Sequence, residues 1–157
     1  MRAKAVLCLS VSLLLWFTAG SLNRAAAQAV SATSPVGRWR TVDDVSGKVK
    51  SVVTIELQNG KLVGSVAKLL DPDPNNPAQP CVTCTGKLKG KSLVGVRILW
   101  DMKQVDDSWS GGFIMDPKTD SVYRCTMTVE DGGKKLKVRG FIGISLLGRT
   151  QFWYREE

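Results

Sequence analysis

Apolar and polar residues alternate in short runs from Gly37 to Arg155, and turn residues interrupt the alternation every eight to twelve positions. Period two is the repeat of a strand with one buried face. In the segment 49–57 the apolar face is formed by Val49, Ser51, Val53, Ile55 and Leu57. The Asn59-Gly60 pair that follows favours a two-residue type I′ turn, because both residues tolerate positive φ. The pattern predicts antiparallel β-structure without a long helix.

Eight strands are expected, at residues 37–43, 49–57, 62–70, 93–102, 109–115, 122–130, 135–140 and 149–155. Tight turns join most of them, and the one long loop, residues 71–92, contains four prolines that block ladder hydrogen bonds. A meander without long crossovers favours an eight-stranded antiparallel up-and-down barrel, because closure pairs the first strand with the last and leaves no edge. A two-sheet sandwich is the alternative, although sandwiches usually need Greek-key connections.

The N-terminal residues 1–27 have the three parts of a secretory signal peptide. A basic start precedes an apolar run from Ala5 to Phe17, and small residues follow up to Ala27. This run of 13 residues is shorter than the roughly 20 that cross a hydrocarbon core. The sequence therefore predicts no transmembrane segment. We expect cleavage after Ala27, with Ala29 as the alternative, and export to the periplasm, with secretion from the cell as a further option.

Removal of residues 1–27 leaves enough chain for one domain with one core. The net charge falls from +8 to +5, because three basic residues and no acidic residue lie in that segment. Such a charge suits contact with anionic lipid, lipopolysaccharide or cell-wall polymer, and it serves solubility equally well. Nucleic-acid binding is not expected, since basic residues do not cluster in a stripe with interleaved aromatic residues.

The chain contains no histidine. Ser-His and Cys-His nucleophiles and histidine-ligated zinc are therefore excluded. The acidic pairs at 43/44, 71/73 and 106/107 all lie in predicted turns or loops, where aspartate is favoured for local hydrogen bonds. The sequence thus predicts no catalytic residue, no metal site and no cofactor, and we expect a protein that is not an enzyme.

Cys81 and Cys84 are expected to form a disulfide, because two cysteines at this spacing usually pair in an oxidising compartment. A thioredoxin-like redox site is the first alternative, but it needs a helix after the first cysteine, and residues 85–87 show no helical pattern. A zinc site is the second, and it needs four ligands. Cys125 lies on an apolar strand face, either as a buried thiol or as a partner of Cys81 or Cys84.

Six segments together resemble an exported bacterial family, domain of unknown function 2147. They are G-R-W-R-T-V-D-D at 37–44, G-K-L-V-G-S-V-A-K-L-L at 60–70, C-V-T-C-T-G at 81–86, G-V-R-I-L-W at 95–100, G-G-F-I-M-D-P at 111–117 and V-R-G-F-I-G-I-S-L-L-G-R-T-Q-F-W at 138–153. The resemblance implies a calycin-type barrel similar to lipocalins and fatty-acid-binding proteins, and no established activity. The predicted organisation is a signal peptide at 1–27, a linker at 28–36 and an eight-stranded, lipocalin-like barrel at 37–157.

The pair Gly37-x-Trp39 is similar to the N-terminal motif of lipocalins. In that family the tryptophan packs across the closed end of the barrel, often beside an arginine of the last strand. Arg149 or Arg155 would be the partner here, through cation–π stacking. The alternative is a core tryptophan after a flexible glycine.

A barrel of eight strands is either filled by side chains or open enough for one small molecule. Inward-pointing arginines would meet a carboxylate head group, and aromatic residues would line an apolar cavity. Candidate ligand-binding residues on this basis are Trp39, Arg97, Trp100, Arg124, Arg139 and Arg149. Glycines within the strands provide room or mark bulges. The apolar segment Ile142 to Leu147 is a candidate lid or plug.

Two functions fit these features. The first is a periplasmic module that binds a small hydrophobic or amphipathic ligand, such as a fatty acid or lipid fragment, in the barrel. The second is a non-enzymatic structural or envelope-stress protein that acts through its surface. The sequence identifies no protein partner.

Overall fold

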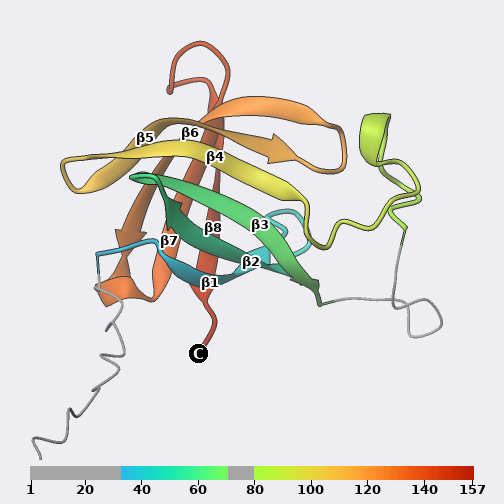
Figure 1. Ribbon diagram of the computed structural model, residues 1–157, viewed down its shortest axis with the longest axis horizontal. Helices are drawn as coiled ribbons and strands as arrows, with labels where there is room; N and C mark the ends of the chain where they lie inside the picture. The colour runs from blue at the N-terminus through green and yellow to red at the C-terminus, as the bar shows by residue number, and fades with distance from the viewer. Residues whose placement is uncertain (1–32, 71–79) are drawn as a thin grey trace, which may run out of the picture.

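The computed structural model describes residues 33–70 and 80–157. The predicted signal peptide with Ala27 and Ala29, and part of the proline-rich loop, lie outside the described residues. The strands are β1 (Gly37–Val42), β2 (Val49–Gln58), β3 (Lys61–Leu69), β4 (Arg97–Val105), β5 (Ser108–Asp116), β6 (Ser121–Glu130), β7 (Lys135–Phe141) and β8 (Gly148–Arg155). Two single-turn 3₁₀ helices, η1 (Gly86–Leu88) and η2 (Asp131–Gly133), complete the described elements (Figure 1).

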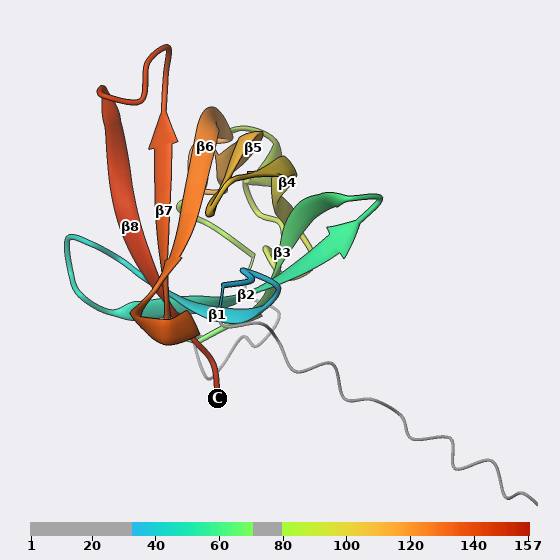
Figure 2. The same cartoon turned by 90° about the vertical axis from the view of Figure 1, so that its left-hand side faces the viewer.

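The strands form a closed antiparallel barrel in the order β1 to β8 (Figures 1 and 2). Closure comes from β1 and β8, in which Trp39 faces Arg155 and Thr41 faces Trp153. The up-and-down barrel is thereby confirmed, and the sandwich is not observed. No helix within residues 33–70 and 80–157 has the length and apolar character needed to cross a membrane.

Turn residues place the strand ends close to their predicted positions. Asn59 and Gly60 have φ values of 51° and 76°, which confirms the type I′ turn between β2 and β3. The strand predicted at 93–102 is the one clear difference, since β4 begins only at Arg97. Gly95 has a φ of 86°, and the Val96 N–H donates to the carbonyl oxygen of Leu93 in a tight turn. The apolar residues before Arg97 are therefore part of a turn beside β3.

One end of the barrel is closed by Trp39, which is fully buried. The Trp39 indole N–H donates to the carbonyl oxygen of Pro35 at 2.7 Å, and the Arg155 guanidinium lies 4.2 Å from the centroid of the Trp39 ring. Arg155 also donates to the carbonyl oxygens of Ser34, Val36 and Gly133. Burial lowers the pKa of Arg155, but the guanidinium remains charged at neutral pH. Of the two arginines expected beside Trp39, Arg155 takes this place.

Two glycines of β5 show why strand glycines do not all mark free space. Gly111 has a φ of 76° at a break in the register between β5 and β6, as in a β-bulge. A Cβ on Gly112 would clash with the backbone of β4 at Trp100. Gly140 of β7 lines the cavity, but a Cβ there would meet the side chains of Ile114 at 3.3 Å and Tyr123 at 3.5 Å. The bulge interpretation thus holds for Gly111 of β5, and Gly140 allows close packing of neighbouring side chains.

Candidate functional site

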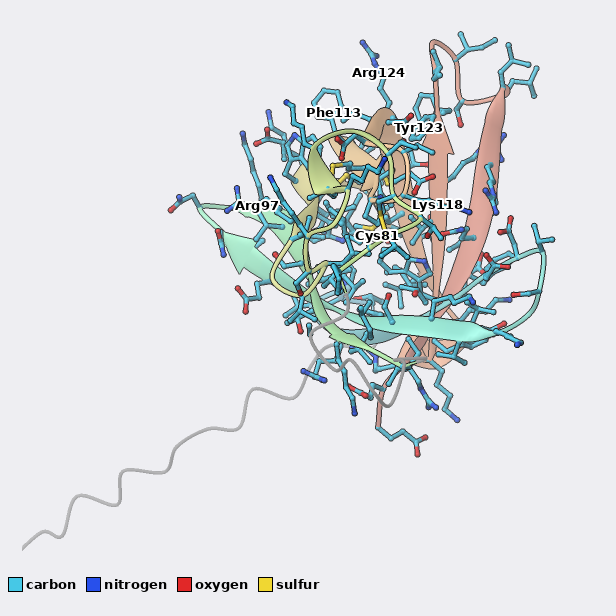
Figure 3. The ribbon with its side chains drawn as sticks, turned by 90° about the vertical axis from the view of Figure 1, so that its right-hand side faces the viewer. Cys81, Arg97, Phe113, Lys118, Tyr123 and Arg124 are labelled. Atoms are coloured by element: carbon cyan, nitrogen blue, oxygen red, sulfur yellow. A yellow bond between two sulfur atoms is a disulfide. The ribbon has the colours of Figure 1, made fainter. Side chains whose placement is uncertain are left out.

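The end of the barrel opposite Trp39 contains a cavity of about 970 Å³. It lies where β1, β3, β5 and β7 end, so its rim is formed by the loops that join these strands to the next ones. Figure 3 shows this side of the molecule, with the segment that carries Cys81 in front of the barrel and Lys118 and Tyr123 beside it. The barrel therefore has one closed end and one open end.

The inner wall of the cavity is mainly apolar. Its deeper part is formed by Val66 of β3, Ile98 of β4, Ile114 of β5, Val138 of β7 and Trp153 of β8. Each strand contributes these residues from the face that its alternation turns inward. The register of β2 against β3 shifts between Val52 and Val53, and as a result both Val66 and Leu69 reach the cavity. Such a wall favours a hydrocarbon chain over a polar ligand.

A polar strip crosses this wall where β1, β2 and β8 meet. The hydroxyl oxygens of Thr41 and Ser51 lie 2.7 Å apart, and Gln151 lines the same side of the cavity. The Trp153 indole N–H donates to the Gln151 side-chain oxygen at 3.5 Å. All three polar side chains are half-buried. They offer hydrogen bonds to a polar group that enters part of the way into the barrel.

Charged side chains surround the mouth of the cavity. Arg149 lines the rim and donates from Nε to a carboxylate oxygen of Asp44 at 2.6 Å, with a second close contact from Nη2. This pairing holds the pKa of the Asp44 carboxyl below its usual value and raises the pKa of Arg149. Lys118 lies on the rim and its side chain is exposed. The mouth can therefore attract an anionic group.

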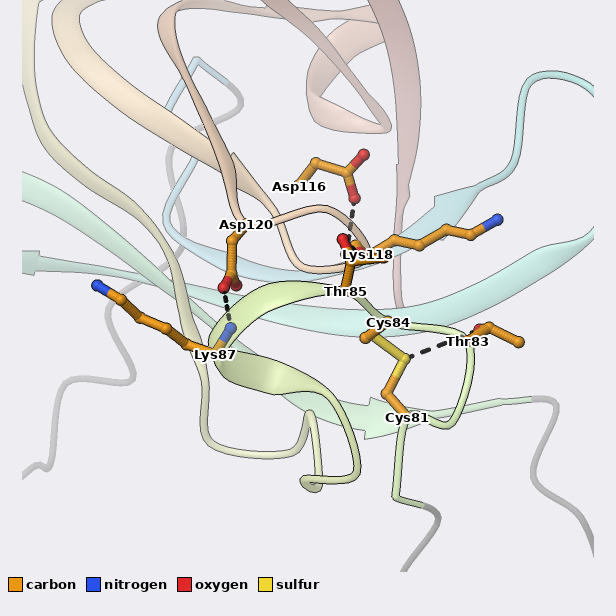
Figure 4. The surroundings of a disulfide bond; sticks show 8 residues. All are labelled: Cys81, Thr83, Cys84, Thr85, Lys87, Asp116, Lys118 and Asp120. Carbon is orange, nitrogen blue, oxygen red and sulfur yellow. Dashed lines mark hydrogen bonds between the residues drawn. A yellow bond between two sulfur atoms is a disulfide. The ribbon is translucent and has the colours of Figure 1, made fainter.

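The Cys81–Cys84 disulfide is confirmed, and both of its residues line the cavity. The loop that carries it packs on the β5–β6 turn, because the Thr85 N–H donates to the carbonyl oxygen of Lys118 at 2.8 Å and the Lys87 N–H donates to the Asp120 carboxylate (Figure 4). The first helix after the cysteines in the described chain is η1, which has three residues and starts at Gly86. The disulfide thus shapes a loop that forms one side of the opening.

Cys125 is a free, buried thiol on β6. It lies between Gly112 of β5 and Gly140 of β7 in the register of the sheet. Burial raises the pKa of the Cys125 thiol to about 12, so the thiol is protonated and unreactive at neutral pH. Cys125 therefore pairs with neither Cys81 nor Cys84.

Thiol alkylation tests this arrangement in unreduced protein that lacks residues 1–27. Iodoacetamide at pH 8 is expected to leave the folded protein unmodified, because the Cys125 thiol is buried and protonated. In denaturant the same reagent is expected to add one label. Intact mass spectrometry reads the number of labels, and three labels in denaturant would contradict the disulfide.

The six candidate ligand-binding residues do not gather at one site. Arg149 is the member of the set that lines the cavity. Trp39 lies in the closed end, and Trp100 stacks on Phe113 with ring centroids 5.9 Å apart. Arg97 and Arg124 are exposed, and Figure 3 shows Arg124 pointing away from the barrel.

Strand periodicity explains why the arginines lie outside. Val138 and Gly140 face the cavity, so Arg139 between them faces outward. Its guanidinium donates to the carbonyl oxygens of Ser145 and Leu146 and to the Thr150 hydroxyl. The same alternation turns Arg124 outward, since its neighbour Cys125 is buried. The sequence analysis did not include Thr41, Ser51, Lys118 and Gln151 among the candidates. Strand alternation places Thr41, Ser51 and Gln151 on inward-facing positions and could have identified them, whereas Lys118 lies in a turn.

The closed meander, with one end sealed by a tryptophan–arginine pair and the other open to a cavity, defines a lipocalin-like barrel. The chain belongs to the family described as "Uncharacterized protein conserved in bacteria (DUF2147)", whose model matches residues 37–155. Among solved structures it is similar to protein HP1028 from Helicobacter pylori, which is described as belonging to the lipocalin family. The identity is 21%, the match covers 79% of this chain and 84% of that chain, and the TM-score is 0.65. No curated protein matches the sequence.

Proposed function

We propose that this protein binds one small amphipathic molecule, such as a fatty acid or lipid fragment, in the open end of its barrel. The observation that carries the proposal is the cavity of about 970 Å³, which combines an apolar inner wall with a charged rim, where Lys118 and Arg149 lie beside the carboxylates of Asp43 and Asp116. Ligand pockets typically measure about 300 to 1,000 Å³, so the space suits a ligand with a long hydrocarbon chain. The chain would contact Ile98 and Ile114, and the head group would lie near Lys118 and Arg149.

The same features support a carrier rather than an enzyme. Without histidine, paired carboxylates are the catalytic arrangement that the sequence suggested. The carboxylates at the rim are held in local contacts, because Asp43 accepts hydrogen bonds from the Ser46 N–H and hydroxyl and Asp44 binds Arg149. We place the protein in the periplasm on the strength of residues 1–27, whose pattern is that of a signal peptide.

Titration with cis-parinaric acid, a fluorescent fatty acid, tests the proposal. Fluorescence is expected to rise and saturate at one molecule per protein, because the probe leaves water for an apolar site. Palmitate should displace the probe, and methyl palmitate should do so about tenfold less well, because it lacks the charge that the rim attracts. Absence of saturable uptake would contradict the proposal and favour a protein that acts through its surface.

The Asp44–Arg149 pair allows a sharper test of the rim. Asp44→Asn removes the carboxylate that competes with a ligand for Arg149. Affinity for palmitate is expected to rise about threefold to fivefold, which corresponds to the loss of one exposed ion pair. Asp106→Asn, in the β4–β5 turn at the closed end, is the matched control and should change nothing. Equal affinity of both variants in the displacement assay would show that Arg149 does not contact the head group.

A further inference from the structure

The loop between β7 and β8 exposes four large apolar side chains at the open end of the barrel. Ile142, Ile144, Leu146 and Leu147 have exposed fractions of 71%, 61%, 82% and 71%. Figure 2 shows this loop rising beyond the ends of the neighbouring strands. Ile142 and Leu147 also border the cavity mouth, but the loop does not fill the barrel. A cluster of this kind on a protein surface marks a binding surface.

Hydrogen bonds hold the loop in this shape. Arg139 donates to the carbonyl oxygens of Ser145 and Leu146 at 2.7 and 3.1 Å, and to the Thr150 hydroxyl at 2.8 Å. The Leu147 N–H donates to the carbonyl oxygen of Ile144, which closes a turn at the tip. One guanidinium thus ties the loop backbone to β7, which carries Arg139, and to Thr150 of β8. The apolar side chains are therefore presented to the exterior by a supported backbone.

Cations lie on the opposite side of the same opening. Lys87, Lys89 and Lys91 are exposed, and within the described chain they take part in no ion pair. Their loop is bonded to the β5–β6 turn that carries Lys118, a residue of the cavity rim. The result is a surface at the open end with an apolar tip on one side and exposed ammonium groups on the other.

The acidic residues near this surface are already engaged. Asp44 binds Arg149, and Asp43 caps the β1–β2 turn through Ser46. Asp116 accepts a hydrogen bond from the Lys118 N–H, and Asp120 accepts one from the Lys87 N–H. These contacts hold the carboxylates within the loops but leave them charged, whereas the ammonium groups of Lys87, Lys89 and Lys91 are exposed to solvent. This difference favours an anionic binding partner.

We propose that the open end of the barrel docks on an anionic lipid surface. The apolar tip, defined as Ile142, Ile144, Leu146 and Leu147, would enter the boundary between head groups and acyl chains, and the lysines would contact lipid phosphates. Docking in this way places the cavity mouth against the source of its amphipathic ligand. The inference goes beyond the proposed function, because docking depends on the exterior of the loops and not on the cavity.

Sedimentation with sucrose-loaded vesicles tests the docking. The wild-type protein is compared on phosphatidylcholine vesicles and on vesicles that also contain about 30% phosphatidylglycerol. The wild-type protein and all variants are produced from the full chain, and intact mass spectrometry checks that they have the same N-terminus. Binding is expected on the anionic vesicles and should weaken as salt is raised, since salt screens the lysines.

Two variants and two matched controls separate the apolar and cationic contributions. The double variant Ile144→Ser/Leu146→Ser changes the two residues of the apolar tip that do not border the cavity. This variant and the double variant Lys87→Glu/Lys89→Glu should each bind about tenfold or more weakly. Leu57→Ser and Lys134→Glu change exposed residues near the closed end and should bind like wild type. Thermal melting confirms that each variant is folded.

Two results would overturn the docking proposal. One is the absence of wild-type binding to anionic vesicles, which would assign the apolar tip to a protein partner. The other is equal binding by the loop variants and their controls. Because the loop variants leave the inner wall of the cavity unchanged, they should still take up cis-parinaric acid from solution. Loss of vesicle binding with retained uptake therefore separates docking from ligand binding.

Discussion

Replacing Ile114 with aspartate is expected to weaken binding of cis-parinaric acid by about 100-fold. Ile114 lies on the inner wall of the cavity and packs on the core from β5. A carboxylate at this place would have to give up water when a hydrocarbon chain enters, and it would also repel the ligand's own carboxylate. Fluorescence titration of the folded variant measures the effect.

Val122→Asp is the matched control for Ile114→Asp. Val122 belongs to the adjacent strand β6 but is 49% exposed, so a carboxylate there stays in water. Affinity is expected to remain at the wild-type value. Leu69→Asp adds a second test at the shallower part of the cavity, where less core packing is lost. Wild-type affinity in both Ile114→Asp and Leu69→Asp would mean that the ligand binds elsewhere.

The second large effect concerns the closed end. Trp39→Ala is expected to lower the free energy of unfolding by about 3 to 5 kcal/mol, because it leaves a cavity under β1 and removes the ring on which Arg155 stacks. Urea denaturation followed by far-ultraviolet circular dichroism measures the loss. Trp100→Ala is the control, since Trp100 is only half-buried, and a cost of about 1 to 2 kcal/mol is expected.

Ligand affinity in Trp39→Ala provides a further check. Trp39 does not line the cavity, so the folded fraction of this variant should bind cis-parinaric acid as wild type does. An equal stability loss in Trp39→Ala and Trp100→Ala would contradict the role of Trp39 in closing the barrel. A large loss of affinity in folded Trp39→Ala would contradict the separation of a closed end from a binding end.

Local sequence rules were enough to predict the barrel. Period two located the strands, and Asn59-Gly60 defined a turn whose φ values the structure confirms. Compartment chemistry predicted the disulfide of Cys81 and Cys84. These features depend on neighbours in the chain, so no knowledge of distant contacts was needed. The predicted start of β4 at residue 93 was wrong, because apolar content alone does not reveal a turn at Gly95.

The cavity was harder to predict, because its lining comes from every strand and from loops far apart in the sequence. Charge suggested Arg97, Arg124 and Arg139, yet alternation turns each of them away from the interior. Val66 and Leu69 line the cavity together only because the β2–β3 register shifts. The position of Arg155 over Trp39, rather than Arg149, likewise depends on how β1 pairs with β8. Register and closure are properties of the whole sheet.

Native mass spectrometry of protein expressed from the full chain and purified from cells tests the proposed ligand binding most directly, because it detects a bound molecule without the choice of a probe. A population with the added mass of one amphipathic molecule is expected, and this added mass should be lost on extraction with organic solvent and regained on incubation with palmitate. The same population should be reduced in Ile114→Asp. A clean mass of the unliganded chain that palmitate does not change would contradict ligand binding in the barrel.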